Sequence, residues 1–576
     1  MVNAFLKQLN KVAVVAGYRN LTDYLVRLVL PVGMILSLLG LFIYYFLTIL
    51  PWFTGFVVLG AGWIIALGYA PVKYSSANKD IQENLHLFIT YAGTISTMKV
   101  ERGILFRKMS EKKVFGEISE IFSKAYYLAK GWNLGYAEAC RVMVDRTPNP
   151  ILADFLDRMA VVMDFGQNLE TFLYDEQKSI LDDYEIEYKK SLESIKMIQD
   201  LFISLTISFA FILGLSMLAP LMLDIPIENI ILIGTGILLL LDICLIIALV
   251  NLVPRDDLTA NLKEKNHEQK TLKAIFIATF SFSLIIFIML NFLVNWELIT
   301  ILAISSIPLA IPGFMGNTEE QRVERRNKQF PIYVRILGTS IQVRDGGVIS
   351  ALRSIQVHDF GVINSMSVNL YRRLRIGSDK FKSWYKFAVE SGSRMISNFS
   401  KIFSESVYLG GNAEKIGEIV SANMTRLTGL RKFREQQSGS LRGAFYGSMI
   451  GLIATVFVTA KIAELLLSIF GQQNLEGELS DLADTIIPTT QTISFEAVFL
   501  YVSILILFHS AASAWIMKII DGGSKYTALI DFILLLWIGA ALAWIVPQGV
   551  DALLPDIAEV FEDFDGDGDA IDIEDV

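Results

Sequence analysis

The chain has 576 residues, of which 53% are hydrophobic, and its mean hydropathy is +0.48. Soluble globular domains contain about 45–50% apolar residues, so this composition excludes an ordinary soluble protein and indicates one that spans a membrane. The net charge of −9 describes no single surface, because the charge is divided unevenly along the chain.

Nine stretches approach the ~20 apolar residues that a bilayer core requires. We expect transmembrane helices at residues 25–47, 52–72, 199–223, 230–253, 273–294, 298–315, 443–460, 496–517 and 527–546. These spans divide the chain into spans one and two, a first soluble domain, spans three to six, a second soluble domain, spans seven to nine and an acidic tail. The corresponding ranges are 1–72, 73–198, 199–315, 316–442, 443–546 and 547–576.

The positions of lysine and arginine predict the orientation in the membrane. Basic residues precede span one, fill the connection between spans four and five, and flank the connection between spans eight and nine. They are Lys7, Lys11, Arg19, Arg255, Lys263, Lys265, Lys270, Lys518 and Lys525. The segments expected on the other side, 223–229, 294–297, 471–495 and 547–576, contain neither residue. We therefore expect a cytoplasmic N-terminus and an external C-terminus.

Both soluble domains have apolar residues at helical spacing, as in Ile81, Leu85 and Phe88 of the first and Phe330 and Val334 of the second. Strand-like alternation is absent from the sequence. The fold class that we predict is an all-α polytopic membrane protein with two cytoplasmic helical bundles. Their charges differ: residues 315–442 carry 21 Lys and Arg against 11 Asp and Glu, whereas residues 73–200 carry 17 against 20.

The chain contains an internal repeat. "DFGQNLETFL" at 164–173 aligns with "YLGGNAEKIG" at 408–417, which places Gly166 on Gly410 and Asn168 on Asn412. Residues 88–109 align with 333–355, and there Gly103 falls on Gly347 with a slip of one residue. We predict that all four glycines end helices in the left-handed conformation, so that their role is structural.

A helical bundle ending in "MDFGQNLETFL" at 163–173, followed by about 25 polar helical residues and then a transmembrane hairpin, resembles the type II secretion F-domain. Two copies in one nine-span chain resemble the archaeal membrane platform proteins of that family, which serve archaella and related type IV pili and have TadC as a bacterial cousin. The resemblance implies a non-enzymatic platform: a hexameric secretion ATPase docks on its cytoplasmic side, and prepilin-like subunits pass from the lipid bilayer into a growing filament.

The basic second domain offers a surface for that ATPase. "YRRLRIGSDKFKSWYK" at 371–386 interleaves basic and aromatic residues, a pattern suited to docking an acidic protein. We predict that the docking residues are Arg372, Arg373, Arg375, Lys380, Lys382 and Lys386. Nucleic acid is not expected as a partner, because the chain has no recognised nucleic-acid motif.

Catalytic and cofactor motifs are absent from the sequence. There is no P-loop, no Rossmann glycine pattern, no HExxH, and no cysteine and histidine spacing typical of a metal site; Cys140 and Cys244 belong to different regions. We therefore expect no enzymatic activity and no bound cofactor.

Asp242 lies near the centre of span four, where a carboxylate costs about 2.5–3.5 kcal/mol on insertion scales. A functional role competes with a neutral aspartate bonded to a facing Ser, Thr or backbone group, and we favour the second because the sequence places no other intramembrane charge beside it. His509 of span eight is predicted to be a hydrogen-bonding helix contact. Lys461 and Glu464 are spaced to pair with each other.

The tail reads "DFDGDGDAIDIE" at 563–574, which matches the EF-hand calcium loop. The calcium ligands would come from Asp563, Asp565, Asp567, Asp569 and Glu574. A solvated acidic tail is the competing interpretation, since the chain supplies no exiting helix.

A transporter is the main rival to the platform, because internal repeats and an intramembrane carboxylate are typical of transporters. Two repeats in the same orientation, each containing a large soluble domain, count against it. A channel or sensor is not favoured either, because no span contains a pore-like ring of polar residues. The sequence leaves open an archaellum or an adhesive pilus, and a monomer or a homodimer.

Overall fold

A computed structural model describes residues 2–46, 54–98, 101–217, 227–254, 258–259, 267–343, 347–472 and 495–553. Helices make up the regular structure of these residues, apart from one isolated bridge between Thr259 and Ser393. The chain forms two compact units. The first comprises residues 1–188, 326–391 and 395–428, and the second comprises residues 189–325, 392–394 and 429–576.

Long apolar helices confirm an all-α polytopic membrane fold. The helices that contain or flank the predicted spans are α3 (Leu30–Phe46), α4 (Thr54–Ser96), α9 (Leu169–Ser216), α10 (Ile227–Leu252), α11 (His267–Leu293), α12 (Leu298–Ser305), α13 (Ala310–Val343), α18 (Ala413–Gln472), α20 (Phe495–Asp521) and α21 (Ala528–Leu553). Eight stretches within the described residues are long and apolar enough to cross a membrane. The second predicted span, 52–72, is not among them and is only partly described, so the count of nine stays a prediction.

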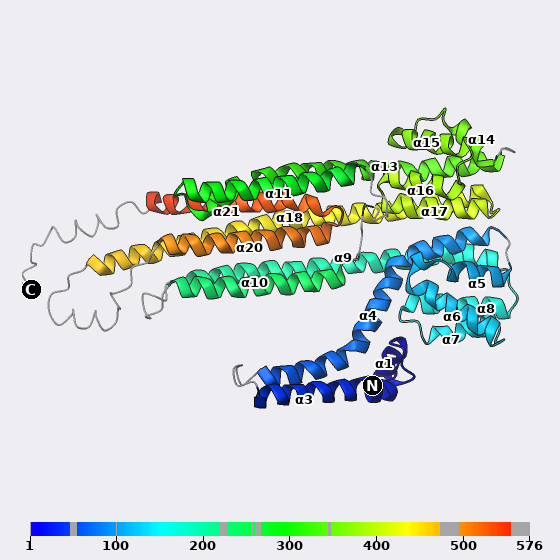
Figure 1. Cartoon of the computed structure of the whole chain (residues 1–576), viewed down its shortest axis with the longest axis horizontal. Helices are drawn as coiled ribbons and strands as arrows, with labels where there is room; N and C mark the ends of the chain where they lie inside the picture. The colour runs from blue at the N-terminus through cyan, green and yellow to red at the C-terminus, as the bar shows by residue number, and fades with distance from the viewer. Residues whose placement is uncertain are drawn as a thin grey trace, which may run out of the picture. The chain divides into compact units, whose positions relative to one another are not determined.

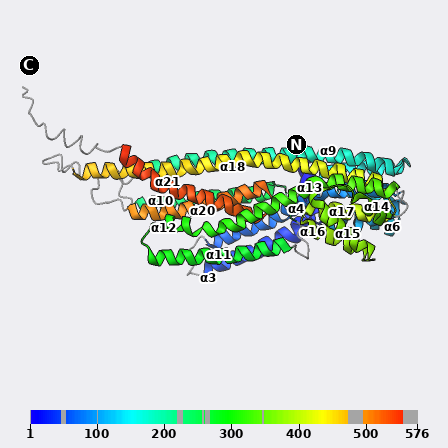
Figure 2. The ribbon, with the colours of Figure 1, turned by 90° about the horizontal axis from the view of Figure 1, so that it is seen from above.

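Within the second unit the long helices run side by side, with α10 along α20, and α21 beside α20 and α12 (Figures 1 and 2). Large apolar side chains point outward: Ile233, Leu240 and Ile243 of α10 are each more than half exposed. Apolar residues turned away from the protein are what a surface in contact with lipid tails requires. The second unit is thus built as a transmembrane helical bundle.

The first bundle belongs to the first unit and consists of the end of α4, the start of α9, and four helices between them: α5 (Arg102–Ser110), α6 (Glu117–Gly131), α7 (Tyr136–Val144) and α8 (Pro150–Asp164). Its core contains a fully buried cluster of aromatic rings, in which Phe88 lies 4.9 Å from Phe122 and 6.3 Å from Phe155 between centroids. The helix α1 (Val2–Val15), the short α2 (Leu21–Tyr24) and the π-helical turn η1 (Leu25–Val29) pack with α3 and α4 in the same unit.

The second bundle belongs to the same unit. It consists of the end of α13, the start of α18 and the four helices between them in the chain: α14 (Gly347–Ile355), α15 (Asn364–Arg375), α16 (Lys380–Ser391) and α17 (Arg394–Tyr408) (Figure 1). Aromatic packing again forms the core, with the rings of Tyr333 and Phe387 stacked 6.0 Å apart and fully buried. Four short 3-10 turns complete the described part of the chain: η2 (Lys113–Phe115), η4 (Ile307–Leu309), η5 (Gly361–Ile363) and η6 (Lys525–Thr527).

The duplicated corner adopts the same geometry in both bundles. Gly166 follows α8 at φ +65°, and Gly410 follows α17 at φ +91°. Each corner is a Schellman motif: Gly166 N–H donates to Met163 O and Gln167 N–H to Val162 O, just as Gly410 N–H donates to Val407 O and Gly411 N–H to Ser406 O. The left-handed role predicted for Gly166 and Gly410 is confirmed.

The asparagine two residues later begins the next helix in both copies. Asn168 Oδ1 accepts from Glu170 N–H at 2.9 Å, and Asn412 Oδ1 accepts from Lys415 N–H at 3.0 Å. These are N-caps, which satisfy backbone donors that have no partner inside the helix. The pair of glycine and asparagine therefore ends one helix and starts the next within three residues.

The prediction for Gly103 is wrong, and the prediction for Gly347 is right only in part. Gly103 is the second residue of α5 with an ordinary helical backbone, because that helix starts at Arg102. Gly347 has a left-handed φ of +66°, but it is the first residue of α14. A glycine beside a helical run has the same sequence signature at either end of a helix, which explains the error.

Candidate functional site

The predicted docking segment folds as two short helices joined by a tight turn. The helix α15 ends in a third Schellman motif, in which Gly377, at φ +79°, donates to Leu374 O and Ser378 N–H donates to Arg373 O. Asp379 Oδ1 then accepts from Lys382 N–H at 2.8 Å and starts α16. The turn thereby holds the basic ends of both helices close together.

Most of the predicted docking cations face solvent. The inward faces of α15 and α16 are apolar, with Leu370, Leu374, Trp384 and Phe387 buried. We define the basic face as the five exposed cations Arg372, Arg375, Lys380, Lys382 and Lys386. Arg373 does not belong to it: its guanidinium is half-buried and forms an ion pair with Glu390 of α16. Arg373 thus joins the two helices, and its role in docking stays a prediction.

Aromatic and apolar side chains lie among these cations. The Arg375 guanidinium lies 5.6 Å from the ring centroid of Tyr371, and the Lys380 ammonium lies 4.6 Å from that of Tyr408. Ile376 is 76% exposed and Phe381 is 45% exposed. Exposed apolar groups among cations are typical of a surface that binds another protein.

The two bundles of the first unit meet through a buried polar network that the sequence did not reveal. Asn423 Nδ2 on α18 donates to Thr90 Oγ1 on α4 at 2.8 Å, and Asn423 Oδ1 accepts from Gln177 Nε2 on α9 at 3.0 Å. Ser406 Oγ donates to Thr94 Oγ1 at 2.9 Å, and both are fully buried. Such contacts fix one relative position of the bundles, because an unpaired polar group would be left buried in any other.

Ion pairs surround this network. Lys112 pairs with Glu405, and Arg426 pairs with Asp182 at 2.5 Å between Nη1 and Oδ1. Nearby Tyr91 is buried, and burial together with the negative charge of Glu405 raises the pKa of its phenol, so that it stays neutral at physiological pH. Each bundle supplies both an acidic and a basic partner. The first bundle, whose segment has a net charge of −3, and the second, whose segment has a net charge of +10, are therefore also joined by local ion pairs.

In the second unit, Asp242 of α10 faces His509 of α20. The Oδ2 and Nδ1 atoms are 2.9 Å apart, and the side chains are 1% and 2% exposed. The expectation of a Ser, Thr or backbone partner for Asp242 is wrong, whereas a helix contact by His509 is confirmed. Asp242 Oδ1 and the hydroxyls of Ser510 and Ser513 have no hydrogen-bond partner among the described residues. The pair holds α10 and α20 together, while neighbouring polar atoms form no hydrogen bond of their own.

A buried arginine links three chain segments of the same unit. Arg434 of α18 is 1% exposed, and its guanidinium donates to the carbonyls of Ile520 at 2.6 Å, Pro254 at 2.8 Å and Ile519 at 2.9 Å. Two of these carbonyls end α20, where free acceptors and the negative end of the helix dipole favour a cation. Sequence reasoning missed this residue because it lies in an ordinary polar run before span seven.

The remaining predicted residues take no part in a shared site. Lys461 and Glu464 pair at 3.0 Å as predicted. Burial raises the pKa of the Cys140 thiol to about 12, which leaves it unreactive, and Cys244 is exposed on α10. Within the described residues no cluster of His, Cys, Asp and Glu could hold a metal ion. The calcium loop predicted at 563–574 lies outside the described residues.

Comparisons with known proteins place these features in a family. Residues 88–217 match the family described as type II secretion system protein F. The chain is 32% identical over 554 residues to flagella accessory protein J of Methanocaldococcus jannaschii, an alignment that covers 92% of this chain and 96% of the relative. It is 28% identical over 550 residues to flagella accessory protein J of Methanococcus voltae, with the same coverage. No solved structure matches the chain.

Proposed function

The chain belongs to the family of flagella accessory protein J, and from that premise we propose that it is the membrane platform on which an archaellum is assembled. The observation that carries the proposal is the similarity over nearly the whole chain, soluble bundles and spans together. A platform must hold a cytoplasmic motor and a membrane-borne subunit in one place, and this chain combines a transmembrane bundle with two further bundles that are joined by buried hydrogen bonds.

The finer part of the proposal is that a hexameric secretion ATPase docks on the basic face. Five exposed cations with no ion-pair partner among the described residues, next to exposed Ile376 and Phe381, fit an acidic protein surface that contains apolar contacts. The platform itself carries out no catalytic step and takes its energy from the ATPase, while prepilin-like subunits enter from the bilayer.

The experiment is a matched pair of charge reversals in cells. The test variant is Arg372→Glu, Arg375→Glu and Lys382→Glu, which leaves the Arg373–Glu390 ion pair intact. The control variant is Lys130→Glu, Arg146→Glu and Lys178→Glu, three exposed cations of the first bundle. We expect the test variant to insert normally and to lose filaments and motility, and the control to retain both. Wild-type filaments in the test variant would refute docking at this face.

Orientation is proposed from the basic connections: N-terminus and bundles in the cytoplasm, C-terminus outside. Labelling of introduced cysteines with a membrane-impermeant thiol reagent in intact cells tests it. Lys270→Cys is expected to react only after lysis, and Gly549→Cys before it. The opposite pattern would invert the topology and place the basic face outside the cell.

One observation favours the rival transporter: the buried Asp242–His509 pair, which is titratable and lies within the membrane bundle. A platform needs this pair only as a helix contact, so Asp242→Asn, which retains an acceptor for the histidine, is expected to support filament assembly. Loss of filaments with normal protein level and normal ATPase binding would favour a transport function.

A further inference from the structure

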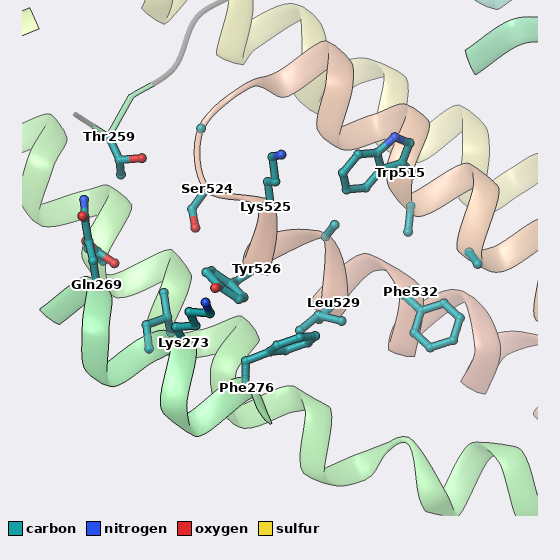
Figure 3. Close-up of a pocket in the computed structure, with 16 residues that line it drawn as sticks. Thr259, Gln269, Lys273, Phe276, Trp515, Ser524, Lys525, Tyr526, Leu529 and Phe532 are labelled. Atoms are coloured by element: carbon teal, nitrogen blue, oxygen red, sulfur yellow. The ribbon is translucent and has the colours of Figure 1, made fainter. Parts of the chain in front are cut away.

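A cavity of about 720 Å³ lies within the second unit, where α11, the end of α20 and the start of α21 come together (Figure 3). Its size falls within the ~300–1,000 Å³ typical of small-molecule sites. The turn between α20 and α21 forms one wall, and Gly522 and Gly523 bend it with φ of +78° and +83°. Ser524 N–H donates to Glu320 and anchors this turn against α13.

The lining changes from polar to apolar in one direction. The helices α11 and α21 both begin at the same end of the unit, so successive residues of each run the same way into the span. Along α11 the lining goes from Gln269 to Lys273 to Phe276, and along η6 and α21 it goes from Lys525 to Leu529 to Phe532. Figure 3 shows the polar residues gathered at one end and Phe276, Leu529 and Phe532 at the other.

The two lysines of this cavity are exposed and have no ion-pair partner among the described residues. Neighbouring cations differ: Lys518 pairs with Glu320 at 3.0 Å, and Arg322 pairs with Glu268 at 3.0 Å. The lining also contains the carboxylate of Glu319, which is buried and already has an interaction partner. A net positive charge therefore remains at the polar end of the cavity.

The cavity lies at the ends of two candidate membrane spans. Lys273 and Lys525 occur at the starts of the membrane-spanning stretches Glu268–Leu293 and Lys525–Val550. Trp515 and Tyr526 line the same cavity, and these two residue types gather at membrane–water interfaces. The span in α11 is almost entirely exposed, with 6% of it buried, whereas 50% of the span in α20 is buried. The α11 side of the cavity therefore faces lipid.

We propose that this cavity binds one anionic phospholipid from the adjoining leaflet. The phosphate binds at the polar end of the cavity, where Lys273 and Lys525 supply positive charge. Gln269 and Ser524 are available to the polar headgroup, and the acyl chains follow Phe276, Leu529 and Phe532 into the membrane. Basic pockets between transmembrane helices at a membrane surface recognise lipid headgroups in this way. A soluble anion would use the lysines alone and would leave the apolar half of the cavity without a ligand.

The test measures lipid binding to the purified full-length protein by native mass spectrometry, with phosphatidylglycerol and phosphatidylcholine as probes. We expect phosphatidylglycerol to be preferred, and Lys273→Gln with Lys525→Gln to weaken its binding roughly twentyfold, since one basic residue near an anionic surface accounts for about fivefold. The matched control is Lys196→Gln with Lys270→Gln, two exposed lysines of the same unit outside the lining. It is expected to bind as the wild type does.

A second arm separates lipid from free anion. Leu529→Trp fills the apolar half without changing charge, and we expect it to weaken phosphatidylglycerol binding while inorganic phosphate at millimolar concentration does not compete with the lipid in the wild type. Equal binding of the two lipids, an equal loss in the control variant, or full competition by inorganic phosphate would overturn the proposal.

Discussion

The two soluble bundles share a corner and differ in charge and in how tightly their helices approach. Both close through a left-handed glycine and an asparagine cap, at Gly166 and Asn168 in one and Gly410 and Asn412 in the other. Yet the segment that contains the first bundle is slightly acidic, and the one that contains the second carries a local +10 and the basic face. The features in common are those that a helical bundle needs in order to fold, and the features that differ lie on surfaces, where a partner would bind.

The bundles differ again at the crossing between the helix that leads into each bundle, α4 or α13, and the helix that leads out of it, α9 or α18. A Gly–Thr pair occupies this crossing in both, at Gly93 in α4 and Gly338 in α13. A Cβ at Gly338 would lie 2.5 Å from the carbonyl oxygen of Ala413 and 3.1 Å from the Cα of Gly417. At Gly93 the nearest atom would be the Oε1 end of the Gln177 side chain. The second crossing is thus made by backbone against backbone, and the first by backbone against a side chain.

The largest effect is expected from breaking the tighter crossing. Gly338→Ala should destabilise the second bundle by about 3 kcal/mol, because backbone cannot move aside as a side chain can. Gly93→Ala should cost less, about 1–2 kcal/mol, because the end of the Gln177 side chain can shift more readily than backbone, although the shift strains its hydrogen bond to Asn423. Hydrogen exchange of the full-length protein, followed by mass spectrometry, reports the opening free energy of each bundle separately. Equal losses in the two variants would contradict the difference between the crossings.

Removing the contact between the bundles should have the next largest effect. Asn423→Leu leaves Thr90 and Gln177 buried without their partner, which costs about 1–3 kcal/mol. Because the lost bonds join the bundles, faster exchange is expected in α4, α9 and α18 together. Asn412→Ala, at an exposed cap of the same helix, is the control and should affect the start of α18 alone. Faster exchange confined to one bundle would show that the network is not shared.

Much of this fold was readable from the sequence because its signals are local. Hydropathy located the long helices, and the repeated glycine and asparagine located the corners. Contacts between distant residues were not readable: Asp242 and His509 are 267 positions apart, and Asn423 lies 333 positions from Thr90. The ion pair of Arg373 was hidden for the same reason, because the basic pattern of 371–386 does not reveal which cation meets Glu390.

The shared corners should respond equally to the same change. No atom lies within 4 Å of a Cβ added at Gly166 or Gly410, so the cost of alanine comes from the left-handed backbone alone. We expect Gly166→Ala and Gly410→Ala each to destabilise their own bundle by about 1 kcal/mol, measured by the same exchange experiment. Gly131→Ala, at the end of α6 with open space and an ordinary φ, should be neutral or slightly stabilising. A corner variant that behaves like Gly131→Ala would remove the strain argument for that corner.

The smallest effect on stability and the largest on function belong to the basic face. The measurement that tests the platform account most directly is binding of the full-length protein in detergent to a purified hexameric secretion ATPase, the proposed partner, across a salt series. For wild type and the Lys130, Arg146 and Lys178 reversal, affinity should fall steeply as salt rises from low concentration to about 0.5 M, since the Debye length shrinks below ~10 Å over that range. The Arg372, Arg375 and Lys382 reversal should unfold as the wild type does and bind at least tenfold more weakly at low salt. Binding that ignores both salt and this reversal would contradict docking through the basic face of the second bundle.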